Sequence, residues 1–156
     1  RYGAVPADLH GVDLLPDRVE RARELLPAAT INAADAQALP FEGDSFDLVL
    51  GFTLLSSVTD AAAQRRVASE MLRVARPGGL IVLYDFWTNP LNRHVQPLRR
   101  RDVQALFPAR HIVFRNATLA PPIVRALLRL PGGRLPATFL ELVPFLQTHY
   151  VTAVHV

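Results

Sequence analysis

The sequence contains no cysteine and no lysine, and each absence excludes a group of chemistries. Without cysteine there is no disulfide, no thiolate nucleophile and no zinc–thiolate site, and such a composition favours a cytoplasmic location. Without lysine there is no Schiff-base chemistry, no phosphate-loop lysine and no Tyr-x-x-x-Lys dehydrogenase site. All 17 basic residues are arginine. The lack of both cysteine and lysine leaves few classes of enzyme compatible with this sequence.

Long hydrophobic runs are also missing. No apolar stretch approaches the roughly 20 residues that a membrane-spanning helix needs, so we expect no membrane span. The arginines that give the net charge of +3 are scattered, with one run at Arg99–Arg101. Because no aromatic residues are interleaved with that run, we expect no nucleic-acid partner. The sequence starts at Arg1 without a signal sequence, and we expect it to be a fragment.

The remaining composition is that of a globular protein. Of the 156 residues, 50% are hydrophobic, which suffices for one core, so residues 1–156 are expected to form a single domain that is incomplete at its N-terminus. The five histidines show no metal-ligand spacing, and no metal site is predicted. Residues 120–147, apolar and interrupted by proline, either form a lid or helical insertion or pack on the sheet.

Strand and helix patterns alternate along the chain. Pro16 and the acidic first turn open a helix that presents Val19, Ala22, Leu25 and Leu26 on one face. A later helix, capped by Thr59 or Asp60, is expected to end at the Arg76–Gly79 turn. The expected strands are Leu9–Leu15, Thr30–Ala33, Phe46–Phe52, Leu80–Tyr84, Arg110–Leu119 and Thr148–Val156. The helix opened by Pro16 is expected to span Asp17–Leu26, and further helices are expected at Arg99–Phe107, Ile123–Leu130 and Ala137–Leu146. The alternation predicts an α/β fold with a doubly wound, mostly parallel sheet and an antiparallel C-terminal strand.

In such a sheet, ligands collect at the carboxyl ends of the strands, where this sequence places Asp13, Asp35, Phe52 and Asp85. Asp13 can accept both hydroxyls of a ribose, or it caps the following helix. Asp35 can meet an adenine amino group, or it forms an Asx-turn. Leu14 and Phe52 offer apolar surface for a nucleoside, although Phe52 alone is more typical of a core.

Four segments together resemble the successive motifs of class I methyltransferases of the type 11 group: Gly11–Leu14, Ala34–Phe41, Ser45–Leu50 and Arg76–Leu80. Their order and spacing match, and the likeness covers roughly Leu9 to Phe86. The resemblance implies a Rossmann-like fold and a transferase that uses S-adenosyl-L-methionine. The tail, with an Asp-Phe then Asn-Pro loop after Tyr84, resembles a bacterial subgroup.

The resemblance also implies residue roles. Asp13 would take the ribose hydroxyls, Leu14 would lie against the adenosine, Asp35 would meet the adenine amine, and the Ala36 backbone would approach the ring. Phe52 would border the methyl-transfer cavity. The family's first central strand and its glycine-rich loop would lie upstream of Arg1, so the middle of the sheet is expected to be open.

Methyl transfer needs an aligned acceptor and, for some acceptors, a base. The candidates for this base are Asp85, His94, Tyr84 and His149. Asp85 is the best placed of them, and His94 lies in the loop that is expected over the pocket. The acceptor can be a small molecule, a lipid or a glycan, and the oligomeric state is not predicted. Two alternatives stay open: a non-catalytic degenerate domain that binds a partner, and a nicotinamide-nucleotide oxidoreductase.

Overall fold

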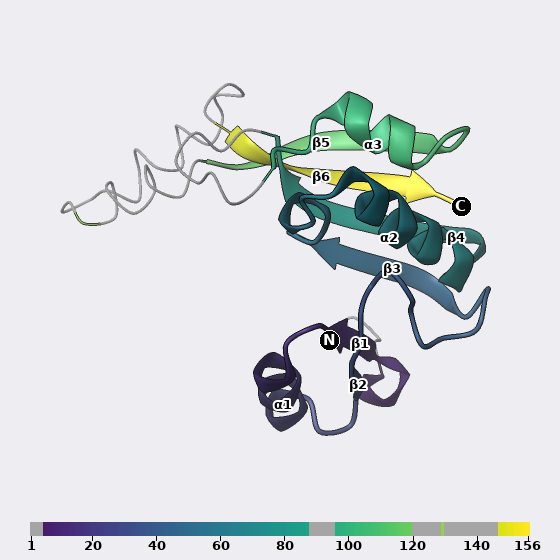
Figure 1. Cartoon of the computed structure of the whole chain (residues 1–156), viewed down its shortest axis with the longest axis vertical. Helices are drawn as coiled ribbons and strands as arrows, with labels where there is room; N and C mark the ends of the chain where they lie inside the picture. The colour runs from purple at the N-terminus through teal and green to yellow at the C-terminus, as the bar shows by residue number, and fades with distance from the viewer. Residues whose placement is uncertain (1–4, 88–95, 120–128, 130–146) are drawn as a thin grey trace. The chain divides into compact units, whose positions relative to one another are not determined.

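The computed structural model describes residues 5–87, 96–119, 129 and 147–156 (Figure 1). The chain divides into two compact units, Arg1–Glu42 and Gly43–Val156. The described strands form two sheets, one of two strands and one of four. The predicted helices at Ile123–Leu130 and Ala137–Leu146 and the candidate base His94 lie outside the described residues, apart from Arg129.

The first unit is a parallel strand pair with one helix. It contains η1 (Pro6–Asp8), β1 (His10–Asp13), α1 (Pro16–Leu25) and β2 (Thr30–Ala33). In the β1–β2 ladder His10 lies opposite Thr30 and Asp13 lies opposite Ala33, so the carboxyl ends of both strands meet at one edge. Pro16 occupies the first turn of α1, where its missing N–H costs nothing.

The helix face expected in the first unit is only partly buried. Val19 is buried as predicted, but Leu25 and Leu26 are exposed. Strand β1 is also more exposed than the buried strand we expected. The reason is physical: a two-stranded sheet with a single helix is too narrow to cover a full helix face and both faces of its strands.

The second unit is a four-stranded sheet in the order β3-β4-β6-β5. Its elements are β3 (Phe46–Phe52), η2 (Leu55–Ser57), α2 (Ala61–Val74), β4 (Ala75–Phe86), α3 (Arg100–Leu106), β5 (His111–Leu119) and β6 (Gln147–His155). Strands β3 and β4 pair in parallel, whereas β6 is antiparallel to both of its neighbours, β4 and β5. The prediction of an otherwise parallel sheet with a reversed C-terminal strand is therefore confirmed for this unit.

The core of the second unit lies between the sheet and its helices. Figure 1 shows α2 and α3 in front of the sheet. The face of α2 that the sequence predicted is buried along its whole length, at Ala63, Val67, Met71 and Val74. Gly51 on β3 allows α2 to pack close to the sheet, because a Cβ at position 51 would lie 3.1 Å from side-chain atoms of both Leu83 and Met71.

One further expectation needs correction. The Arg76–Gly79 segment, expected as a turn, belongs to β4, because the chain end pairs with it: Gly78 donates to the carbonyl of Val156, and Val156 donates to the carbonyl of Gly79.

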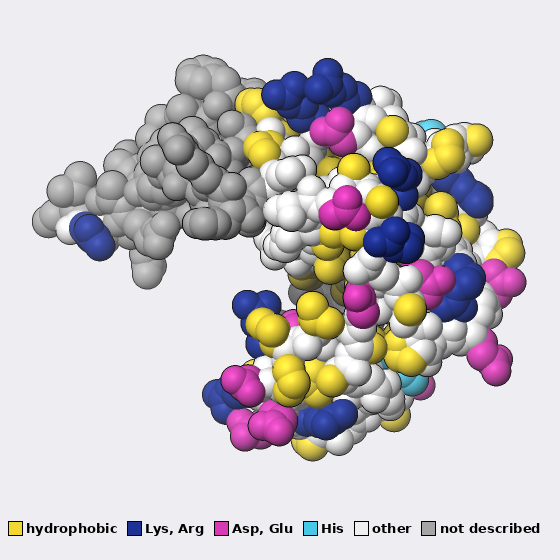
Figure 2. Space-filling model, viewed as in Figure 1, with side chains coloured by type: hydrophobic (Ala, Val, Ile, Leu, Met, Phe, Trp, Pro, Cys, Tyr) yellow, Lys and Arg dark blue, Asp and Glu magenta, His cyan; other side chains and the backbone are white. Residues whose placement is uncertain are grey.

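The surface of the described residues is mixed in charge. In Figure 2, arginine side chains are dispersed among acidic ones on the visible face. No helix within the described ranges is long and apolar enough to cross a membrane.

Candidate functional site

The first unit brings together four of the predicted cofactor-binding residues. Asp13 ends β1, and Leu14 follows it. Asp35 and Ala36 come directly after the end of β2, and the backbone N–H of Ala34 donates to the carbonyl of Asp13 at 3.1 Å. Both carboxylates therefore lie at the same edge of the sheet, as the sequence predicted.

Asp13 shapes the turn between β1 and α1. Its Oδ1 accepts a hydrogen bond from the N–H of Leu15 at 2.9 Å, and its Oδ2 lies 3.8 Å from Arg18, a weak surface pair. The helix begins after Leu15 with no side-chain cap, so the alternative role of Asp13 as the helix cap is wrong. A carboxylate has about four acceptor positions, which leaves Asp13 capacity for the hydroxyls of a ribose.

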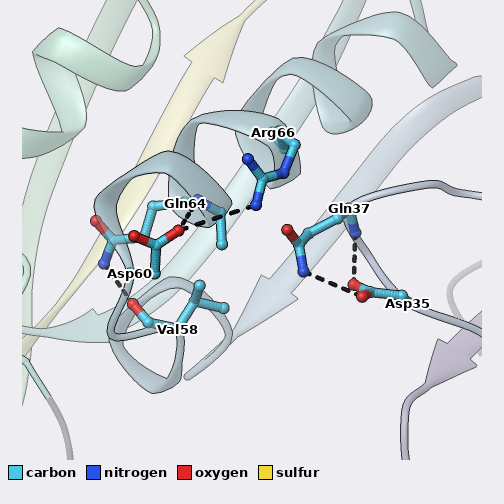
Figure 3. Close-up of polar contacts among 7 residues, drawn as sticks. Asp35, Gln37, Val58, Asp60, Gln64 and Arg66 are labelled. Carbon is cyan, nitrogen blue, oxygen red and sulfur yellow. Dashed lines mark hydrogen bonds and ion pairs between the residues drawn. The ribbon is translucent and has the colours of Figure 1, made fainter.

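Asp35 forms the Asx-turn that was one of its two predicted roles. Its Oδ1 accepts from the N–H of Gln37 at 2.9 Å, and its Oδ2 accepts from Nε2 of the same residue at 3.0 Å (Figure 3). The side chain remains exposed. The turn and a contact with an adenine amine are compatible, since each oxygen retains a lone pair.

Each unit also exposes an apolar side chain that the sequence proposed for the nucleoside. The side chain of Leu14 is 68% exposed, which is unusual for leucine and suits a residue that packs on a nucleoside. Phe52 belongs to the second unit, at the end of β3, and is 60% exposed. The reading of Phe52 as a core residue is therefore wrong. Its ring meets that of Tyr84 edge to face, and Tyr84 in turn stacks on His149.

Directly after Phe52, the chain makes a strained turn at residues 53–58. Thr53 has φ of +50°, a left-handed conformation that is costly for a β-branched residue. Its N–H donates to the carbonyl of Tyr84 at 2.7 Å, and its carbonyl accepts from the hydroxyl of Ser57 at 2.6 Å. Ser57 thus acts as a turn residue.

The turn is also tied to α2. Nε2 of Gln64 donates to the carbonyls of Leu55 and Val58, at 2.8 and 2.9 Å, and the Val58 contact is drawn in Figure 3. Asp60 caps the helix by accepting from the N–H of Ala63 at 2.7 Å, which confirms one of the two predicted caps. The first turn of α2 therefore fixes the chain that leaves β3.

Asp85 lies near the end of β4 but is completely buried. Burial raises the pKa of its carboxyl to about 6, while the hydroxyl and N–H of Ser56 and the N–H of Leu55, which face it, lower that pKa in part. Phe52 pairs with Tyr84 in the β3–β4 ladder, so Phe52 and Asp85 project to opposite faces of the sheet. The role of base stays a prediction for Asp85.

Three residues that matter here have no clear signal in the sequence: Thr53, Gln64 and Thr152. The strain at Thr53 follows from tertiary contacts and has no local signal. Gln64 reads as an ordinary helix-surface residue, and Thr152 as an ordinary strand residue, although it is fully buried. Among the described residues, no group of His, Asp or Glu side chains is arranged to hold a metal ion.

Comparison with known proteins identifies the family. Residues 1–83, more than half of the chain, match the family described as "Methyltransferase domain". A 2-methyl-6-phytyl-1,4-hydroquinone methyltransferase from Synechocystis is 36% identical over 100 residues, which cover 58% of this chain and 30% of that protein. A demethylmenaquinone methyltransferase from Clavibacter sepedonicus is 43% identical over 68 residues, covering 44% of this chain and 24% of that protein. The chain thus spans about a third or less of the length of these relatives.

Solved structures establish the fold. A SAM-dependent methyltransferase from Methanosarcina mazei superposes with a TM-score of 0.70 over 96% of this chain and 84% of that one, at 15% identity. The N-methyltransferase NodS from Bradyrhizobium japonicum, solved with S-adenosyl-L-homocysteine, gives a TM-score of 0.67 over 94% of this chain and 65% of its own, at 14% identity. The chain belongs to the methyltransferase domain family and has the Rossmann-like fold of S-adenosylmethionine-dependent methyltransferases.

Proposed function

We propose that this chain is part of an enzyme that transfers the methyl group of S-adenosyl-L-methionine to a small-molecule acceptor of the quinol or lipid type. The observation that carries the proposal is the pair of carboxylates, Asp13 and Asp35, at adjacent strand ends in a chain of the methyltransferase family. A cytoplasmic location and a bacterial source accompany it as expectations from composition.

The residues of the first unit fit the nucleoside half of the cofactor. Asp13 would accept the ribose hydroxyls, Asp35 would accept from the adenine amine, and the exposed side chain of Leu14 would cover the adenosine. The Ala36 backbone would approach the adenine ring, and Phe52 would border the reacting methyl. Asp13 and Asp35 could make these contacts while keeping the hydrogen bonds of their own turns.

When bound, the cofactor supplies an electrophilic methyl group on a sulfonium, and the transfer is an in-line displacement. The protein then contributes alignment and, for a hydroxyl acceptor, removal of a proton. Asp85 and His94 remain the proposed candidates for that proton transfer.

The acceptor class rests on the relatives. Their names specify a phytyl hydroquinone, a demethylmenaquinone and, in Cereibacter sphaeroides, phosphatidylethanolamine. All three acceptors combine a polar head with a long apolar tail. We extend that shared chemistry to this chain.

The test is transfer of isotopically labelled methyl from S-adenosyl-L-methionine to two probes, a reduced naphthoquinone and vesicles of phosphatidylethanolamine. We expect label in the organic phase with one probe, and at least a tenfold loss in Asp13→Asn. The matched control is Asp8→Asn, which changes an exposed acid of the same unit in η1 and should retain full transfer. Absence of transfer to both probes by a protein that binds the cofactor would reject the acceptor class.

A further inference from the structure

Three fully buried polar side chains lie on the helix-covered side of the second unit: Asp85, Ser56 and Thr152. We call them the Asp85 cluster. Their four side-chain oxygens form no hydrogen bond of normal geometry, although nearly all buried polar groups in proteins have a partner. A cluster of this kind is costly, because a buried charge needs a partner or access to water.

The strand register explains why these groups share one place. In the antiparallel β4–β6 ladder, Asp85 lies opposite Tyr150 and Leu83 lies opposite Thr152, so Asp85 and Thr152 are diagonal neighbours on one face. Tyr150 does not satisfy the carboxylate, because its hydroxyl donates to the carbonyl of Leu98. The groups of Ser56 and Leu55 approach from the end of β3.

Two segments seal the cluster, and we call them the cover: residues 53–58 and residues 96–98. Within the cover, residues 53–58 are tied to α2 by Gln64 and to β4 by the N–H of Thr53. Residues 96–98 are held by two backbone hydrogen bonds and by the hydroxyl of Tyr150, which donates to the carbonyl of Leu98. The N–H of Gln96 donates to the carbonyl of Ser56, and the N–H of Leu98 donates to that of Phe86, both at 3.0 Å.

None of the ion pairs among the described residues includes Asp85. The groups around it are Tyr150 on β6 and, acting on Tyr150 from α3, Arg100 and Asp102. Helix α2 contributes the uncharged Gln64 to the cover, and His149 projects to the opposite face of β6. Desolvation therefore dominates, and it raises the pKa of Asp85 to about 6.

We propose that Asp85 controls the conformation of the cover: a neutral carboxyl is tolerated beneath it, whereas the ionised carboxylate favours an open form in which water reaches the cluster. The cover starts directly after Phe52, so this inference rests on the proposed function for its biological meaning. In that setting, Asp85 sets the pH range in which the turn that follows Phe52 is closed.

Amide hydrogen exchange tests the proposal, with the N–H groups of Gln96 and Leu98 as reporters of the cover. After correction for intrinsic exchange, the equilibrium constant for opening at these two amides should rise about tenfold between pH 5 and pH 8. The reason is that the Asp85 carboxyl binds its proton more tightly when buried than when the cover is open, so opening releases that proton. In Asp85→Asn the equilibrium should not change with pH. At each pH, amides of the β4–β6 ladder should stay better protected than these two reporters, because the ladder opens only when the unit unfolds.

A second measurement needs no variant. The carbon-13 shift of the Asp85 carboxyl should titrate with a midpoint near 6, and the exchange of Gln96 should follow it. An opening equilibrium equal at pH 5 and pH 8, or an identical rise in Asp85→Asn, would overturn the proposal. Binding of S-adenosylhomocysteine, measured on the same samples, tests the proposed function separately, since its loss would leave the exchange result intact.

Discussion

Replacing Asp85 by asparagine removes a charge from the interior of the second unit while keeping the size of the side chain. Because burial raises the pKa of Asp85 from an ordinary value of 3.8 to about 6, the folded protein holds this proton more tightly than the unfolded chain does. The cost of ionisation is absent below pH 3.8, grows as the pH rises, and is complete above about pH 6. The asparagine variant carries no such cost.

The magnitude follows from the size of the shift. About two pKa units correspond to about 3 kcal/mol at full ionisation, and about 2 kcal/mol of this develops between pH 4.5 and pH 7.5. The free energy of unfolding of Asp85→Asn, relative to the natural protein, should therefore increase by about 2 kcal/mol over that range. Other titrating groups cancel in the difference.

Urea unfolding followed by fluorescence is the assay, because the single tryptophan, Trp87, belongs to the second unit and its indole N–H bonds to the carbonyl of Gln147. Asp47→Asn is the matched control, since Asp47 is an exposed carboxylate of the same unit, paired with Arg76 at 2.9 Å. A difference between Asp85→Asn and the natural protein that stays constant with pH would refute the reasoning.

Three further substitutions test the packing and the turns by urea unfolding. Gly51→Ala should destabilise by about 1–3 kcal/mol, because its Cβ would press on Leu83 and Met71; an unchanged midpoint would show that the helix can shift. Asp60→Ala should cost about 1 kcal/mol through loss of the cap on α2, and a neutral result would contradict that role. Thr53→Gly should stabilise by up to about 1 kcal/mol through relief of its positive φ, unless the loss of its hydroxyl contacts outweighs the strain, which a destabilised variant would reveal.

Local sequence signals predicted several elements accurately. Strands Thr30–Ala33 and Phe46–Phe52 have the expected bounds, because turn residues flank each of them. Helix α2 was predicted through its cap at Asp60 and its apolar period. The cofactor-binding prediction placed Asp13 and Asp35 at one edge for a similar reason: both follow short apolar strands, and parallel strands end at the same edge.

The remaining features depend on contacts between distant parts of the chain. Arg76–Gly79 has the composition of a turn, yet pairing with the C-terminus extends β4 through it. The face of the sheet to which the Asp85 side chain projects could not be predicted either, because β4 is apolar on both faces and its sequence does not indicate which face the helices cover. The cluster with Ser56 and Thr152 forms only when β6 and the turn after β3 meet around that carboxyl.

Calorimetric titration with S-adenosylhomocysteine is the most direct test of the central claim, that this chain belongs to an enzyme using S-adenosyl-L-methionine. We expect saturable binding, at least a tenfold loss of affinity in Asp13→Asn, unchanged affinity in Asp8→Asn, and no binding of a nicotinamide dinucleotide. Binding of the dinucleotide in its place would favour the oxidoreductase alternative. Binding of neither compound would contradict the account and favour a non-catalytic domain that binds a partner.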